Sequence, residues 1–160
     1  MKKLIPIFSF IFLILNVFGQ QQINKTLFFD GQSRSYIVYI PASYNGSTQY
    51  PLLFNFHGGG GTAAGFIYTN DMRPLADTAA FIAVYPQAAV DPLDGSNSWL
   101  HKAPTAHNDV NFIEAIIDTL SNNYNIDNDR VYACGYSEGG IFSYELGCRL
   151  NNRIAAFSAI

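Results

Sequence analysis

The sequence predicts an α/β fold with a mostly parallel sheet, and three observations lead to this prediction. Short apolar runs, which are typical of strands buried on both faces of a sheet, alternate with segments whose apolar residues recur at helical spacing. Apolar residues make up 49% of the 160 residues and charged residues only 13%, which supplies a core and argues against a disordered chain. The expected strands lie at residues 52–56, 81–85, 131–134 and 154–160, and the expected helices at residues 72–80, 110–120 and 138–150.

Two earlier segments, residues 26–29 and 35–40, are rich in β-branched and aromatic residues. The dipeptide Asp30-Gly31 separates them and is a common two-residue hairpin turn. Pro41 ends the second segment because proline cannot donate a hydrogen bond to a strand ladder. We therefore expect an antiparallel pair near one edge of the sheet.

The strand at residues 81–85 is followed by a long loop, residues 87–104, and loops of this length often carry function. The next helix is expected to begin after Asn108 as its N-cap, with the Asp109 carboxylate near the positive end of the helix dipole. The run at residues 127–129 contains two aspartates but lacks the later Gly and Glu of a calcium loop. It predicts a turn before the strand at residue 131, and no metal or organic cofactor is expected.

Residues 1–19 have the layout of a secretory signal peptide. Lys2 and Lys3 precede an apolar run at residues 7–15, and the segment ends in the small residue Gly19. A membrane anchor is the alternative, but the apolar stretch covers only residues 4–18, whereas a spanning helix needs about 20 residues. We predict a secreted or periplasmic protein without a stable membrane anchor. The net charge of −3 and the lack of a basic run after Lys3 argue against binding to nucleic acid.

Residues 135–139 match the pattern G-x-S-x-G, with Gly135, Ser137 and Gly139 at the three defined positions. The pattern lies between a predicted strand and a predicted helix, which is the setting of a nucleophile on a tight turn. Glycines at both ends let the strand and the helix approach each other, and the helix N-terminus offers N–H groups to a developing oxyanion. The alternative is an ordinary glycine-rich turn between a strand and a helix.

A second motif follows the strand at residues 52–56. It consists of His57 and four consecutive glycines, Gly58 to Gly61, whose backbone can adopt conformations closed to other residues and can present N–H groups to a substrate oxygen. A flexible linker is the alternative. A phosphate-binding loop is disfavoured because Thr62 is not preceded by the lysine that such loops carry.

From about residue 25 to residue 160 the two motifs and their order resemble the secreted α/β-hydrolase esterases of the polyhydroxybutyrate depolymerase, feruloyl esterase and acetylxylan esterase type. The resemblance implies an α/β-hydrolase fold with helices on both faces of the sheet, and an ester substrate such as a polyhydroxyalkanoate or a plant cell-wall ester. Asn108 departs from the family, which often has an acidic residue there. By resemblance, Ser137 is the nucleophile and the N–H groups of Glu138 and Gly59 form the oxyanion hole, supported by His57, Gly58, Gly60, Gly135 and Gly139.

The base and the acid of a Ser–acid–His triad are expected after the nucleophile. No histidine follows Ser137, and Glu138 and Glu145 lie on the nucleophile helix itself. His57 is expected to be structural, and His101 and His107 are weak candidates for the base. The expectation is that residues 20–160 are the N-terminal portion of one α/β-hydrolase domain whose C-terminal part is missing, so that the 160-residue piece alone is inactive.

Two other functions remain open at this stage. A secreted serine peptidase would use the same site, and a non-catalytic secreted α/β binding domain would fit if the chain ended at residue 160. Trp99, in the long loop, either flanks the substrate or packs in the core. Cys134 and Cys148 are not expected to pair with each other, because the helix carries Cys148 about 15 Å away and disulfides require Cα atoms within about 7 Å. Each is expected to be a buried thiol, unless Cys148 pairs with a cysteine beyond residue 160.

Overall fold

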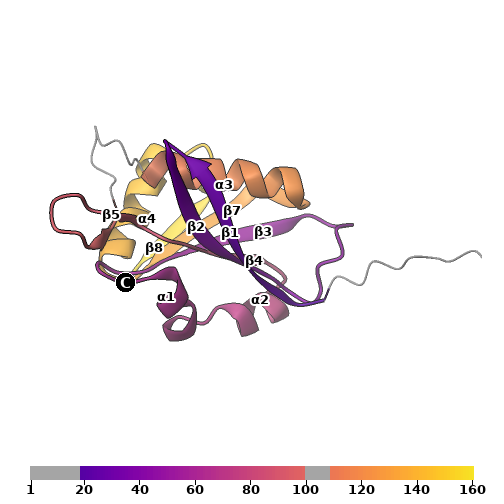
Figure 1. The fold of residues 1–160 in the computed structure, drawn as a ribbon. Helices are drawn as coiled ribbons and strands as arrows, with labels where there is room; N and C mark the ends of the chain where they lie inside the picture. Colours follow the sequence, from indigo (N-terminus) through magenta and orange to yellow (C-terminus); the bar gives the residue numbers. More distant parts are fainter. Residues whose placement is uncertain (1–18, 100–108) are drawn as a thin grey trace, which may run out of the picture.

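The structure is a computed structural model that describes residues 19–99 and 109–160 (Figure 1). Its main sheet has six strands in the order β1-β2-β4-β3-β7-β8. Strands β4, β3, β7 and β8 run parallel to one another, whereas β2 is antiparallel both to β4 and to the edge strand β1. The predicted α/β class is therefore confirmed. The strands of this sheet are β1 (Gln21–Phe29), β2 (Gln32–Ile40), β3 (Tyr50–Phe56), β4 (Ile82–Pro86), β7 (Ile126–Gly135) and β8 (Ala156–Ala159).

The predicted edge pair is the β1–β2 hairpin. Asp30 and Gly31 form its turn with φ angles of 49° and 74°, which are the left-handed values that a two-residue turn of this kind requires. Strand β1 lies at the edge and its residues alternate between exposed and half-buried, whereas β2 is buried from Tyr36 onward.

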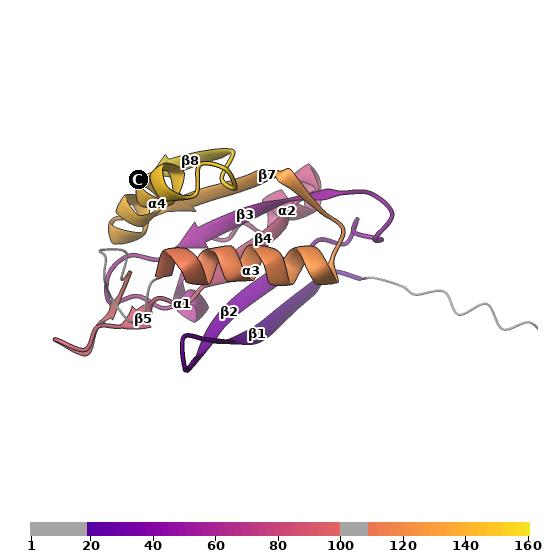
Figure 2. The same ribbon diagram turned by 90° about the horizontal axis from the view of Figure 1, so that it is seen from above.

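Helices cover both faces of the sheet, as Figures 1 and 2 show. Helices α3 (Asp109–Asn123) and α4 (Glu138–Arg149) lie on one face, and α1 (Ala63–Thr69) and α2 (Arg73–Ala79) lie on the other. Alternate side chains of each central strand point to opposite faces of the sheet. Leu52 and Phe54 therefore join the core under α3 and α4, whereas Leu53 packs toward α1. This is why the central strands are nearly continuous apolar runs.

Helix α3 is attached to the edge hairpin by a buried ion pair. The Asp109 carboxylate at the start of the helix pairs with the Arg34 guanidinium of β2, and both side chains are buried. The guanidinium carbon also lies 4.1 Å from the centroid of the Phe112 ring. The Asp109 side chain therefore binds a specific partner in addition to its expected position at the helix N-terminus.

Three local predictions were wrong or incomplete. Helix α1 was not predicted; it starts at Thr62, whose Oγ1 accepts from the Gly65 N–H at 3.0 Å. The predicted turn at residues 127–129 is part of strand β7. The register against β3 shifts there, so Asn128 and Asp129 are exposed and Asp127 is half-buried. The long loop contains a small hairpin of β5 (Ala89–Val90) and β6 (Asn97–Ser98).

Several predictions concern residues outside the described ones: residues 1–18 of the predicted signal peptide, and His101, His107 and Asn108. No helix in residues 19–99 and 109–160 is long and apolar enough to cross a membrane. Cys134 and Cys148 are both free, which agrees with the prediction that they do not pair with each other. Cys148, however, is exposed rather than buried, because it lies on the outer side of α4.

Candidate active site

The G-x-S-x-G segment forms a sharp turn between β7 and α4. Ser137 has φ 52° and ψ −119°, a backbone conformation that residues with a side chain rarely adopt. It occupies the N-cap position of α4, and its backbone oxygen accepts from the N–H groups of Gly140 at 2.9 Å and Ile141 at 3.1 Å. Its hydroxyl makes no capping hydrogen bond and the residue is exposed. The turn thus presents the hydroxyl to solvent, without a hydrogen-bond partner among the residues that the structure describes.

The two flanking glycines are required by close packing. A Cβ atom on Gly139 would lie 2.2 Å from the backbone oxygen of Phe56, and one on Gly135 would lie 2.2 Å from the backbone oxygen of Gly139. Real Cβ atoms do not approach backbone atoms so closely. Helix α4 therefore starts directly against the end of β3, and this contact holds the turn.

The glycine loop after β3 lies against this turn. A Cβ atom on Gly58 would be 3.5 Å from Cβ of Ser137, and one on Gly59 would be 3.0 Å from Oε2 of Glu138. A tight turn shapes the loop, in which the Gly61 N–H donates to the Gly58 oxygen at 3.0 Å and Gly60 has φ +70°. Within the described part of the chain, no acceptor is assigned to the N–H of Gly59 or to that of Glu138. Two unengaged amide donors therefore lie in adjoining segments beside Ser137.

His57 is buried beneath the loop, with both ring nitrogens engaged. Its Nδ1–H donates to the Gly58 oxygen at 2.8 Å, and its Nε2 accepts from the Ala88 N–H at 3.2 Å. These partners assign the neutral tautomer that carries its proton on Nδ1. Burial lowers the pKa of His57. The side chain supports the loop and is not free to take a proton from Ser137.

Trp99 is buried, as the core-packing alternative predicts. Its indole Nε1–H donates to the backbone oxygen of His57 at 2.8 Å. Its ring stacks on Phe142 of α4 with centroids 4.7 Å apart and meets Phe56 edge-on at 5.1 Å. The residue is part of the core and joins the glycine loop to helix α4, because the polar edge of its ring finds a buried acceptor.

The exposed surface beside Ser137 is apolar and aromatic. Ile141 and Tyr144 lie one and two turns along α4 on the same side as Ser137, and with Ile160 they line a hollow of about 410 Å³. Tyr136 lies on the other side, between this turn and the glycine loop. All three of Tyr136, Ile141 and Tyr144 are about 60% exposed. None of the three was predicted from the sequence, although the spacing 137, 141, 144 indicates that Ile141 and Tyr144 share one helix face with Ser137.

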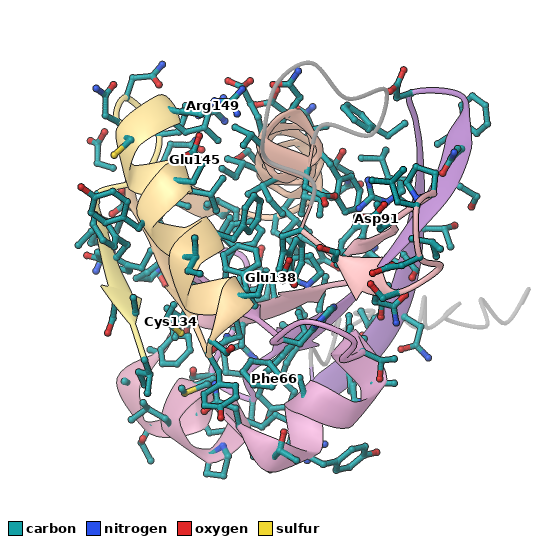
Figure 3. All side chains as sticks on the ribbon, turned by 90° about the vertical axis from the view of Figure 1, so that its left-hand side faces the viewer. Phe66, Asp91, Cys134, Glu138, Glu145 and Arg149 are labelled. Atoms are coloured by element: carbon teal, nitrogen blue, oxygen red, sulfur yellow. The ribbon has the colours of Figure 1, made fainter. Side chains whose placement is uncertain are left out.

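The acidic residue of the site is Glu138. Figure 3 shows it at the end of α4 that faces the β5–β6 segment, with Arg149 at the opposite end of the helix. Its Oε1 accepts from the Ser98 hydroxyl at 2.5 Å, whereas its Oε2 is buried without a partner in the part of the chain that the structure describes. Glu138 thus contacts the long loop through its side chain.

Sequence and structure comparisons point to one group of enzymes. No family model matches the chain. It is 31% identical to feruloyl esterase D of Neurospora crassa over 82% of this chain and 46% of that protein, and 33% identical to a bifunctional acetylxylan esterase/xylanase of Neocallimastix patriciarum over 80% of this chain and 18% of that protein. The chain spans less than half the length of these curated relatives.

Solved structures show the same fold. A ferulic acid esterase superposes with a TM-score of 0.74 at 22% identity, and an S-formylglutathione hydrolase from Agrobacterium tumefaciens with 0.76 at 17% identity. Each match covers 89% of this chain and 58% of the other. The chain therefore has the α/β-hydrolase fold and is a relative of the feruloyl and acetylxylan esterases.

Proposed function

We propose that the protein is a secreted serine esterase that hydrolyses carboxylic esters through an acyl intermediate on Ser137. The observation that carries the proposal is the unengaged Ser137 hydroxyl on a strained turn, with the free N–H groups of Gly59 and Glu138 beside it. This combination supplies a nucleophile and two donors for an oxyanion, which are the groups that acyl transfer needs.

The reaction follows from this arrangement. The Ser137 oxygen attacks the ester carbonyl carbon while its proton passes to a base, and the carbonyl oxygen becomes an oxyanion held by the two N–H groups. The C–O bond to the alcohol then breaks, and the alcohol leaves with the proton from the base. Water repeats the sequence on the acyl-Ser137 ester and releases the carboxylic acid.

The base is proposed to be a histidine after residue 160, oriented by a carboxylate. Both ring nitrogens of His57 bind other groups, and a serine hydroxyl without a base is a weak nucleophile at neutral pH. Feruloyl esterase D is about twice as long as this chain, since the match covers only 46% of that protein. This is consistent with triad members supplied from elsewhere in the protein.

The substrate is proposed to be an ester with an apolar or aromatic acyl group, of the plant cell-wall kind. Two relatives are named feruloyl esterase and acetylxylan esterase, and Tyr136, Ile141 and Tyr144 offer aromatic and apolar surface beside Ser137. Aromatic side chains bind such groups through their large apolar faces. A polyhydroxyalkanoate is the alternative substrate. It is aliphatic, so it would contact the same surface without stacking against the tyrosine rings.

The experiment uses the full-length protein. Wild type is expected to hydrolyse p-nitrophenyl acetate and methyl ferulate, and a fluorophosphonate probe is expected to label Ser137. Ser137→Ala is expected to lose labelling and at least about 10³-fold in kcat. Ser33→Ala, an exposed serine on the distant hairpin, is the matched control. Unchanged hydrolysis by Ser137→Ala would contradict the proposal.

A further inference from the structure

We propose that Asn97, Ser98 and Trp99 are positioning residues that hold the two halves of the oxyanion hole in a fixed relation. This inference rests on the proposed function, because it concerns the N–H groups of Gly59 and Glu138. It assigns to the long loop after β4 a role in catalysis that neither the glycine loop nor the nucleophile turn can supply by itself.

Residues 97–99 form hydrogen bonds to both ends of the glycine loop. The Asn97 backbone oxygen accepts from the Gly60 N–H at 2.8 Å, and its side-chain Nδ2 donates to the Gly61 oxygen at 2.9 Å. On the other side, the Trp99 indole N–H donates to the His57 oxygen at 2.8 Å. Gly59 lies between these anchored points, and its N–H is left without an acceptor among the residues described.

Residues 98 and 99 also contact the first turns of helix α4. The Ser98 hydroxyl donates to Oε1 of Glu138, the residue that bears the second N–H, at 2.5 Å. One turn further along the helix, Phe142 stacks on the Trp99 ring with an interplanar angle of 8°. Three consecutive residues therefore contact both donor segments at once.

The glycine loop needs contacts from outside to hold its conformation. Glycine has more backbone freedom than any other residue, so a run of four glycines loses a large conformational entropy when the loop is ordered. None of them has a side chain that could anchor the loop. Loss of one oxyanion donor lowers kcat by about 10²–10³-fold, and a donor that is only displaced is expected to cost a smaller factor. The β5–β6 hairpin supplies the anchor from outside, and His57, bound to Ala88 beside β5, completes it.

The test uses three variants of the full-length enzyme. Trp99→Phe keeps an aromatic ring against Phe142 but removes the donor to His57; Asn97→Ala removes the donor to Gly61; Ser98→Ala removes the bond to Glu138. Each is expected to lower kcat for p-nitrophenyl acetate about 10- to 100-fold with KM within about twofold. Leu93→Ala, at the exposed tip of the same hairpin, is the matched control and is expected to keep the wild-type rate.

Two readouts separate positioning from a loss of folded protein. Titration with a fluorophosphonate counts reactive sites, so kcat is expressed per active enzyme. Affinity for a phenylboronic acid, which forms a tetrahedral adduct with the nucleophile, is expected to fall by the same factor as kcat, because both depend on the oxyanion donors.

The outcomes are distinguishable. Variants with wild-type kcat per titrated site and wild-type boronate affinity, while Ser137→Ala is inactive, would overturn the positioning role and leave the esterase proposal standing. A rate loss accounted for by fewer titratable sites would overturn it as well. If Trp99→Phe does not fold, Ser98→Ala and Asn97→Ala decide the matter, since both residues are only half-buried. Activity in Ser137→Ala would instead remove the proposed function itself.

Discussion

Besides Ala80 at the end of α2, two non-glycine residues among those described have a positive φ, and the causes differ. Asp30 in the β1–β2 hairpin has φ 49°, and Ser137 before α4 has φ 52°. The hairpin turn is exposed and nothing lies within 4 Å of a Cβ added to its Gly31. The Ser137 turn is confined by Gly135 and Gly139, which touch backbone on either side. The first conformation is a local preference of Asp-Gly, and the second is imposed by tertiary packing.

The largest expected difference between the turns comes from adding one methyl group. Gly139→Ala would place Cβ 2.2 Å from the Phe56 oxygen, and we expect a loss of roughly 4 kcal/mol or more in the free energy of unfolding, because neither backbone can move without displacing β3 or α4. Gly31→Ala meets no atoms and is expected to cost only about 1 kcal/mol, for its positive φ. Urea unfolding of both variants measures the difference. Equal losses would show that packing does not hold the Ser137 turn.

A smaller effect is expected from relieving the strain. Ser137→Gly is expected to raise the free energy of unfolding by about 1 kcal/mol while abolishing ester hydrolysis, because glycine adopts this conformation without a Cβ clash. Asp30→Gly is expected to change stability by only a few tenths of a kcal/mol, since aspartate tolerates the left-handed region. Thermal unfolding checks both variants. A less stable Ser137→Gly would mean that the side chain supports the turn.

The smallest expected effect is a pH dependence of stability, and it involves His57 beneath the glycine loop but not the hairpin turn. Burial lowers the pKa of His57 below that of an unfolded histidine, so the unfolded state binds the proton more readily. The stabilisation is complete above about pH 6.5 and is lost as the pH falls from there through the folded pKa. The Tm is expected to fall between pH 7 and pH 5, and the decrease is expected to be smaller in His57→Gln. Parallel pH profiles for the two proteins would contradict this.

Much of the architecture was predictable because it depends on local patterns. Continuous apolar runs indicated the central strands, and Asp30-Gly31 indicated the hairpin. Helix α1 escaped prediction because only Ala63 and Ile67 of its seven residues are buried, which is too weak a period to detect. Residues 127–129 are polar and therefore indicated a turn. They lie in a strand because the register of β7 shifts where it pairs with β3, and this shift cannot be seen in the sequence.

For the site, the glycine loop and the G-x-S-x-G turn could be predicted from the sequence, as could their positions after parallel strands. Their meeting follows from topology, since parallel neighbours β3 and β7 end at the same edge of the sheet. The sequence did not show that Trp99 is buried and donates to His57, or that Ser98 binds Glu138. It also did not show that Tyr136 and Tyr144 stay exposed, because all of these depend on the folded chain. The physical reason is that periodicity reports whether a residue is apolar, whereas these contacts depend on which loop folds over which strand end.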